Sequence, residues 1–142
     1  RAQLCKLDGW VASRRANARY LPESLGALPG VHVAVPGPDY YHACYKFYLA
    51  LEAARFRAGW DRDRVVSEVN AAGFPCLSGI CPEMYREQAF VRAGLGPGNP
   101  LPVARDLGGR SLLLLVHPTL STCDMERYAE AVAQVIRRAM NG

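Results

Sequence analysis

The most constraining feature of this chain is an uninterrupted apolar segment followed by a capped amphipathic helix. Residues 111–116 are almost entirely leucine and valine, and Pro118 follows them, so we predict a buried strand that ends there. Ser121 can cap a helix with Asp124 in its first turn, and apolar residues then recur at helical spacing as far as Ile136. A strand followed by such a helix indicates that the helix packs on one face of a sheet.

The rest of the chain alternates between helical and short extended patterns. A long amphipathic helix is predicted for residues 4–28, and Pro22 should either kink it or mark the start of a second segment. The further predicted elements are strands over 31–35, 42–51 and 74–77, and helices over 61–73, 83–92 and 102–109. A proline-rich turn makes the first two strands antiparallel neighbours. This order predicts an α+β fold, in which helices pack on a small, mostly antiparallel sheet that a long helix precedes.

The composition is that of one compact domain. The 142 residues are 50% hydrophobic and 21% charged, so the chain can bury a core. No apolar stretch reaches the roughly 20 residues that span a bilayer, and the net charge of +4 is small. We therefore expect neither a membrane nor a nucleic-acid partner. The chain begins with Arg1 and its opening segment lacks a secretory signal, so we expect a cytoplasmic piece of a longer or processed protein.

The five cysteines are irregularly spaced, which is not the pattern of a disulfide scaffold. Only Cys76 and Cys81 lie close together, and no second pair of cysteines or histidines completes a four-ligand zinc set in the sequence. We expect free thiols and no bound metal. Structural zinc or redox chemistry at this pair is the alternative that the spacing leaves open.

No phosphate-binding glycine loop, nucleophile elbow or metalloprotease motif occurs in the sequence. Candidate functional residues are therefore chosen by their positions in the predicted elements. His42 and His117 stand at predicted strand ends, where ligand contact is favourable; a hydrogen-bonded structural histidine is the alternative. The tyrosines around Phe47 could stack on nucleic-acid bases, but we expect core or interface packing. The arginine-rich stretch 52–64 is expected to be a solvated loop and helix start. Residues 78–98 form an irregular region, where function usually concentrates.

A family resemblance extends over the whole chain in order. The segments that carry it are RAQLCKLDGW (1–10), RRANARY (14–20), HACYKFY (42–48), GFPCLSG (73–79), LPVA (101–104) and SLLLLVHPTLS (111–121). They resemble the DegT/DnrJ family, pyridoxal-phosphate-dependent aminotransferases that act mainly on nucleotide-linked sugars. The resemblance implies an interdomain helix over residues 1–30 and a C-terminal small domain over residues 31–142. It also implies that the large, cofactor-binding domain lies upstream of this chain.

The resemblance implies a function that this chain cannot perform alone. The family's Schiff-base lysine belongs to the large domain, and neither Lys6 nor Lys46 matches its segment. We expect the full-length protein to bind pyridoxal phosphate and to form a homodimer, and this chain alone to bind no cofactor. The expected reaction moves an amino group from an amino acid, with glutamate as the expected donor, to a nucleotide-linked keto-sugar, for polysaccharide or secondary-metabolite biosynthesis.

The family's histidine- and proline-rich substrate loop falls on residues 78–90. Matched through the downstream Ala-Phe pair, Tyr85 takes the place of the loop's second histidine, and residues 79–80 that of its first histidine and tyrosine. Losing both histidines implies a branch with a different amino acceptor. The candidate substrate-binding residues are Ser78, Cys81, Glu83, Tyr85, His42 and His117. A loop that only packs on the large domain is the alternative.

Two other classes of function stay open at this point. A non-enzymatic α+β module that binds a small ligand or partner would have the same fold. A basic RNA-binding domain would use the aromatic segment around Phe47. An upstream domain with a cofactor-binding lysine would favour the aminotransferase over both.

Overall fold

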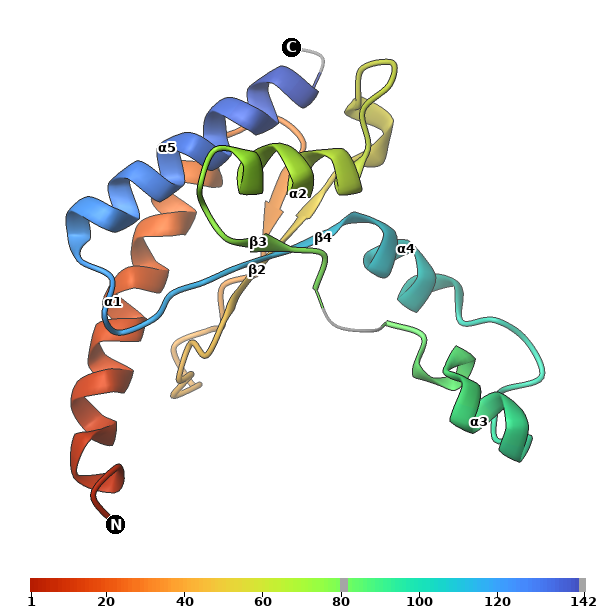
Figure 1. Ribbon diagram of the computed structural model, residues 1–142, viewed down its shortest axis with the longest axis horizontal. Coiled ribbons are helices and arrows are strands. Elements are labelled where there is room, and N and C mark those ends of the chain that lie inside the picture. Colours follow the sequence, from red (N-terminus) through yellow and green to blue (C-terminus); the bar gives the residue numbers. More distant parts are fainter. Residues whose placement is uncertain (80–81, 141–142) are drawn as a thin grey trace.

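The structure is a computed structural model that describes residues 1–79 and 82–140. Figure 1 shows its helices arranged around one small sheet. The strands are β1 (Val31–Val33), β2 (Phe47–Leu51), β3 (Cys76–Leu77) and β4 (Ser111–Leu114). The helices are α1 (Leu7–Leu25), α2 (Arg62–Ala71), α3 (Gln88–Ala93), α4 (Pro102–Arg110) and α5 (Thr122–Ala139), with short 3-10 turns η1 (Leu4–Lys6), η2 (Ala53–Arg55) and η3 (Met84–Arg86). The predicted α+β class is confirmed.

The sheet is antiparallel throughout, in the order β1-β2-β4-β3. Its register pairs Val33 with Leu49 and Leu49 with Leu112, and it pairs Phe47 with Leu114 in the neighbouring row. Because alternate residues of a strand point to opposite faces, these apolar side chains share one face. This is the core face of the sheet.

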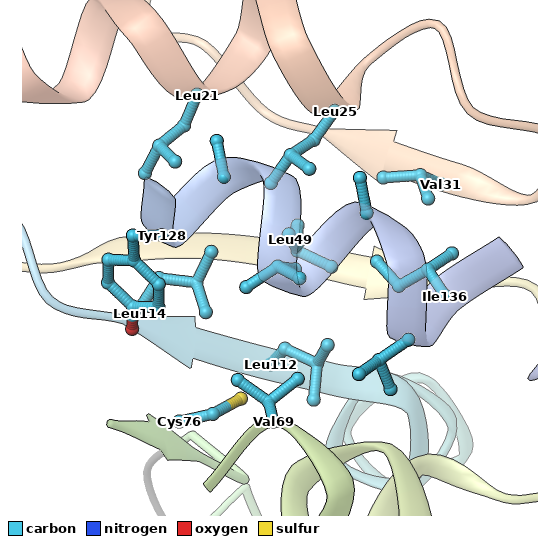
Figure 2. Close-up of a cluster of buried hydrophobic side chains, with 14 of the residues drawn as sticks. Leu21, Leu25, Val31, Leu49, Val69, Cys76, Leu112, Leu114, Tyr128 and Ile136 are labelled. Carbon is cyan, nitrogen blue, oxygen red and sulfur yellow. The ribbon is translucent and has the colours of Figure 1, made fainter. Parts of the chain in front are cut away.

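Three helices bury the core face. Helix α5 packs on both α1 and α2, and Figure 2 shows side chains of all three gathered against β2, β3 and β4. Leu21 and Leu25 of α1, Val69 of α2 and Ile136 of α5 are each at most 1% exposed. Burying a side chain of this size stabilises a fold by roughly 1.5–3 kcal/mol. The apolar stripes of the three helices therefore contribute, with the buried leucines of the sheet, to the stability of this layer.

The opposite face of the sheet is covered only in part. Helix α4 packs near β2 on this side, and Leu113 is buried. Tyr48 and Leu77, which flank Leu113 in the register, stay 39% and 48% exposed. None of the described helices is both long enough and apolar enough to cross a membrane.

The predicted helix ends are confirmed at α2 and α5. Ser121 Oγ accepts from the Asp124 N–H at 3.2 Å, and the Asp124 carboxylate accepts from the Ser121 N–H at 2.9 Å, which is a capping box. The Asp61 carboxylate accepts from the Arg64 N–H at 2.7 Å at the start of α2. Gly73 follows the end of α2 with φ of 88°, a conformation that favours glycine.

Two predicted helices differ from those observed. Helix α1 spans Leu7–Leu25 rather than residues 4–28, and Pro22 lies inside it without ending it. Proline removes its own N–H from the helix, but the Pro22 carbonyl still accepts from the Gly26 N–H at 2.9 Å. The helix predicted over residues 83–92 is divided at Glu87, whose extended backbone separates η3 from α3.

The second strand begins at Phe47 rather than at His42, so this predicted boundary is wrong. Cys44 has φ of 48°, a left-handed conformation that a regular strand does not contain. Arg14 of α1 donates to the Tyr45 carbonyl at 2.9 Å, so that carbonyl is paired with a helix side chain. The apolar alternation before Phe47 therefore belongs to a loop. The other three strands are also shorter than predicted, because their outer residues have no strand partner to pair with.

Candidate functional site

Five of the six predicted substrate-binding residues are described, and they lie in three connections between regular elements. His42 lies in the loop from β1 to β2, and His117 lies in the loop from β4 to α5. Ser78, Glu83 and Tyr85 lie between β3 and α4, and Cys81 lies outside the described residues. Within the described part of the chain, the contacts that join these residues to one another are confined to Glu83 and Tyr85.

Glu83 and Tyr85 form the centre of a polar cluster. The Tyr85 hydroxyl donates to Glu83 Oε1 at 2.5 Å and accepts from the Leu101 N–H at 3.0 Å. Arg86 Nη1 lies 3.1 Å from Glu83 Oε2, and Arg105 Nε lies 3.6 Å from Glu83 Oε1. The Tyr85 hydrogen bond lowers the pKa of Glu83, and the two arginines add to this effect. The carboxylate is thus charged and bound by its own neighbours.

The same cluster holds a projecting segment, residues 82–101, which we call the arm. Figure 1 shows α3 at the far end of the arm, away from the sheet. A Cβ atom added at Gly108 of α4 would lie 2.1 Å from Pro82 Cγ, so only glycine allows this close approach. Residue 82 therefore meets 108, residue 83 meets 105, and residue 85 meets 101. The start of the arm runs antiparallel to α4.

Arg62 contacts the chain before and after the arm, at residues 78 and 108–111, which we call the base of the arm, and the sequence analysis missed it. Its Nη1 donates to the carbonyls of Ser78 at 2.8 Å, Gly108 at 2.9 Å and Ser111 at 3.1 Å. The side chain is 15% exposed, so the residue is not part of a wholly solvated stretch as predicted. One guanidinium thus joins the end of β3, the end of α4 and the start of β4. Nothing in the local sequence distinguishes Arg62 from the neighbouring arginines.

Polar residues of α1 hold the two loops that carry the histidines. Arg15 Nη1 donates to the His42 carbonyl at 3.2 Å. The buried Asn17 side chain donates to the carbonyls of His117 at 3.0 Å and Leu120 at 3.3 Å. The long first helix therefore positions both loops against the sheet.

His42 and His117 make the same local contact. His42 Nδ1 accepts from the Cys44 N–H at 3.1 Å, and His117 Nδ1 accepts from the Thr119 N–H at 3.4 Å. The His117 Nδ1 also lies 2.8 Å from the Thr119 hydroxyl. Each ring closes a turn onto the residue two positions on, as an aspartate or asparagine side chain does. Both histidines are therefore hydrogen-bonded loop residues with exposed side chains, and the predicted positions at strand ends are wrong, because β2 begins at Phe47 and β4 ends at Leu114.

The tyrosines of the 40–48 segment are exposed, which corrects the expectation of core packing. Phe47 is buried, whereas Tyr40, Tyr41 and Tyr45 are each at least 70% exposed. The Arg15 guanidinium lies 4.4 Å from the centre of the Tyr41 ring. The Tyr41 ring thus makes a cation–π contact on a solvent-facing surface. Packing at an interface remains the prediction for these side chains.

A groove lies between α1 and residues 34–48, and we call it the α1 groove. Its volume is about 550 Å³. Its lining includes Arg15, Arg19, Glu23, Tyr40, His42 and Lys46. Three permanent cations face one carboxylate, so the groove favours anionic groups. His42 is the predicted substrate-binding residue that reaches it.

The described residues contain no cluster of three or more side chains that could hold a metal ion. Cys5, Cys44, Cys76 and Cys123 carry free thiols. Burial raises the pKa of the Cys76 thiol to about 11, with Arg62 acting weakly in the opposite direction. Cys76 is therefore a neutral core residue. The predicted pair with Cys81 falls partly outside the described residues.

Neither lysine forms an enclosed cofactor site. Pyridoxal phosphate needs a lysine amine, a partner for its ring nitrogen and a phosphate-binding pocket in one water-excluded place. Lys6 lies in η1, where every residue is exposed. The Lys46 ammonium lies 5.3 Å from the centre of the exposed Tyr45 ring, at the rim of an open groove. The described residues do not fit this cofactor by themselves.

Comparison with solved structures gives matches over nearly the whole chain. An aminotransferase from Psychrobacter cryohalolentis is 36% identical, with a TM-score of 0.86, over 99% of this chain and 38% of that one. DesV of S. venezuelae, solved in complex with a ketimine intermediate, is 27% identical, with a TM-score of 0.78, over 94% of this chain and 33% of that one. This chain thus spans about a third of the length of these proteins.

A third match, the aminotransferase TlmJ from Streptoalloteichus hindustanus, is 22% identical over 96% of this chain and 34% of that one, with a TM-score of 0.81, and it shows the shared fold. No curated protein sequence matches the chain. The family model described as the DegT/DnrJ/EryC1/StrS aminotransferase family matches residues 1–133. That match covers more than nine-tenths of the chain. The chain belongs to the DegT/DnrJ/EryC1/StrS aminotransferase family.

Proposed function

We propose that this chain is the C-terminal small domain of a pyridoxal-phosphate-dependent aminotransferase. The proposed reaction moves an amino group from an amino acid, with glutamate as donor, to a nucleotide-linked keto-sugar in polysaccharide or secondary-metabolite biosynthesis. The family match over residues 1–133 carries the proposal. The ketimine bound to DesV, a relative of 27% identity, supports the amino-transfer chemistry.

The proposed domain division is an interdomain helix over residues 1–30 and a small domain over residues 31–142. The N-terminal end of α1 extends past the sheet in Figure 1. Three apolar side chains of η1 and the first turn of α1, Leu4, Leu7 and Trp10, are 70%, 47% and 38% exposed. The buried residues of α1 begin at Asn17. This exposed end is the part we propose to contact a large domain, in a protein that we propose to be a homodimer and cytoplasmic.

The proposed cofactor, pyridoxal phosphate, would supply the electron sink for amino transfer, from a site beyond these residues. This chain would supply one wall of the substrate cleft. Glu83 and Tyr85 would act by holding the arm on α4, because their polar atoms are already paired with each other. His42 would face the substrate from the α1 groove, which favours the anionic groups of a nucleotide. Ser78, Cys81 and His117 stay predictions.

A domain exchange tests the proposed function. This chain aligns with 38% of the Psychrobacter aminotransferase, so it can replace that part of the enzyme. We expect the chimera to bind pyridoxal phosphate and to accept an amino group from glutamate, as judged by the change in cofactor absorbance. We then expect it to transfer that group to a nucleotide-linked keto-sugar. The control is the parent enzyme with the same junction residues.

Reaction with the keto-sugar and reaction with the amino donor test different parts of the proposal. A chimera that loads cofactor and reacts with glutamate but aminates no keto-sugar would contradict the proposed substrate class. A chimera that folds and binds cofactor but reacts with no amino donor would contradict an aminotransferase role for this domain.

The position of the reactive lysine can be tested on the chain itself. After incubation with pyridoxal phosphate and borohydride, we expect no stoichiometric adduct at Lys6 or Lys46, because neither amine is enclosed. Mass analysis of peptides gives the answer. A specific adduct at either lysine would overturn the domain assignment.

A further inference from the structure

Cys44, which has no role in the proposed function, forms a close pair with His42. Cys44 Sγ lies 3.3 Å from His42 Nδ1, and both residues line the α1 groove. Cys44 is half-buried, and its φ of 48° is uncommon for a residue other than glycine. Backbone conformations of this kind persist where the surrounding structure holds them. Here the turn keeps the sulfur and the imidazole together.

The geometry sets which ring nitrogen faces the thiol. The Cys44 N–H donates to His42 Nδ1 at 3.1 Å, so Nδ1 carries a lone pair and the neutral ring carries its hydrogen on Nε2. The Cys44 Sγ lies 3.3 Å from the same nitrogen, and its thiol also donates to the His42 carbonyl at 3.7 Å. An imidazole in this position can take the thiol proton, and the thiolate is the nucleophilic form of cysteine.

The surroundings of the pair select the charge of an incoming molecule. Arg15, Arg19 and Lys46 line the same groove, and Glu23 is the carboxylate on its lining. Tyr40 adds an exposed aromatic surface at the rim. A molecule with an apolar or aromatic body and carboxylates is therefore favoured over a neutral one of similar size.

We propose that Cys44 is a thiol–disulfide exchange site for small anionic disulfides, with His42 as its base. The Cys44 thiol gives its proton to His42 Nδ1, and Sγ attacks one sulfur of the incoming disulfide. A bond forms between Sγ and that sulfur, while the disulfide bond breaks and the second sulfur leaves with the electron pair as a thiolate. Cys44 is oxidised and the incoming disulfide is reduced. The mixed disulfide then occupies the α1 groove.

Two matched variants of the chain test the proposal with dithiobis(nitrobenzoate), an anionic aromatic disulfide whose leaving thiolate absorbs visible light. The first keeps Cys44, with Cys5, Cys81 and Cys123 changed to serine. The second keeps Cys5, with Cys44, Cys81 and Cys123 changed to serine. Both retain the buried Cys76, which should stay unreactive while the fold is intact. We expect the Cys44 variant to react about tenfold faster than the Cys5 variant.

His42→Asn in the Cys44 variant separates the base from the turn. Asparagine can accept the Cys44 N–H through Oδ1 and close the same turn, but it cannot take a proton. We expect the exchange rate to fall about tenfold. An unchanged rate would overturn the role of His42, and a Cys44 rate no higher than the Cys5 rate would overturn the site itself.

The charge preference is tested with dithiodipyridine, a neutral aromatic disulfide. We expect the ratio of the anionic to the neutral rate to be several-fold higher for Cys44 than for Cys5. Arg19→Gln should lower that ratio for Cys44, because Arg19 lines the groove. Equal ratios at the two cysteines would overturn the proposed preference for anions. A fall of both rates together after Arg19→Gln would contradict its electrostatic role.

Discussion

The helix–sheet core and the arm differ in what holds each of them together. The core is built from apolar side chains of α1, α2, α5 and the sheet, many of them wholly buried. Helix α3 of the arm has no buried residue, and its Val91 is 62% exposed. Polar contacts at Glu83, Tyr85 and Arg105 attach the arm instead. Regions of this second kind open locally at low free energy, whereas the core opens only when the whole domain unfolds.

The largest expected effect comes from the core. Leu114→Ala removes a fully buried side chain from β4 and should lower the free energy of unfolding by about 2–5 kcal/mol. Leu95→Ala is the matched control in the arm, because Leu95 is 68% exposed, and it should change stability by less than about 0.5 kcal/mol. Urea unfolding measures both. Equal losses would mean that the arm shares the cooperative core.

Arg62 lies between the two regions and should have the next largest effect. Arg62→Met keeps much of the side-chain volume but removes the donor from the carbonyls of Ser78, Gly108 and Ser111. We expect a loss of about 1.5–3 kcal/mol, with faster hydrogen exchange at the base of the arm. Arg62→Lys should recover part of the lost stability, because an ammonium can still donate to one or two of the carbonyls. If Arg62→Met were as stable as the parent, the role of Arg62 in joining β3, α4 and β4 would be contradicted.

Removing the capping box of α5 should lower the free energy of unfolding by a smaller amount and should affect the core without affecting the arm. Ser121→Ala removes the side chain that accepts from the Asp124 N–H, and this typically costs about 1 kcal/mol. Since α5 packs on α1 and α2 and carries many of the buried core residues, the loss should appear in global unfolding. Hydrogen exchange in the arm should stay unchanged. Ser121→Asn, another good cap, serves as the control.

Mild acid should loosen the arm before the core. The Tyr85 hydrogen bond and the nearby arginines lower the pKa of Glu83 below its ordinary value of 4.5. Its contacts therefore contribute fully above pH 4.5, and this contribution is lost as the pH falls through the lowered value in the folded chain. Hydrogen exchange across this range should rise first in residues 82–101. Glu83→Gln should remove the pH dependence of hydrogen exchange in the arm. If the pH dependence persisted in that variant, another titratable group would be responsible for it.

The smallest expected effect belongs to Tyr85→Phe. The change removes the hydroxyl that joins Glu83 to the Leu101 N–H and keeps the ring. We expect a several-fold rise in hydrogen exchange within the arm and little change in global unfolding, because α4 and the arm stay joined through Pro82 and Arg105. In the chimeric enzyme, the acceptor half-reaction should slow several-fold to tenfold, while the donor half-reaction stays nearly unchanged. Equal losses in both half-reactions would indicate a general structural role.

The sequence predictions were accurate where contacts between nearby residues determine the structure, and they failed where distant side chains determine it. The starts of α2 and α5 were predictable, because a cap such as Ser121 acts on backbone groups three residues away, whereas the ends of α1, where neither cap residue makes a side-chain hydrogen bond, were not. The start of β2 was not, because an alternating pattern is the same in a strand and in a loop held by distant side chains. Arg14 and Arg15 hold residues 42–45 from about thirty positions away in the sequence. No local pattern contains that information.

The candidate site shows the same limit more strongly. The order of helices and strands, the α+β class and the family resemblance could all be read from residue types and spacings, because these depend on short-range sterics and on the burial of apolar periods. The paired oxygens of Glu83 and Tyr85, the three carbonyls around Arg62 and the sulfur of Cys44 beside His42 could not. A hydrogen bond needs two groups within about 3 Å of each other in the right orientation. The carbonyls around Arg62 lie 16, 46 and 49 positions away in the sequence, so only tertiary packing brings them to that distance. The other two pairs are two residues apart, and the local backbone conformation, such as the left-handed Cys44, brings each pair together.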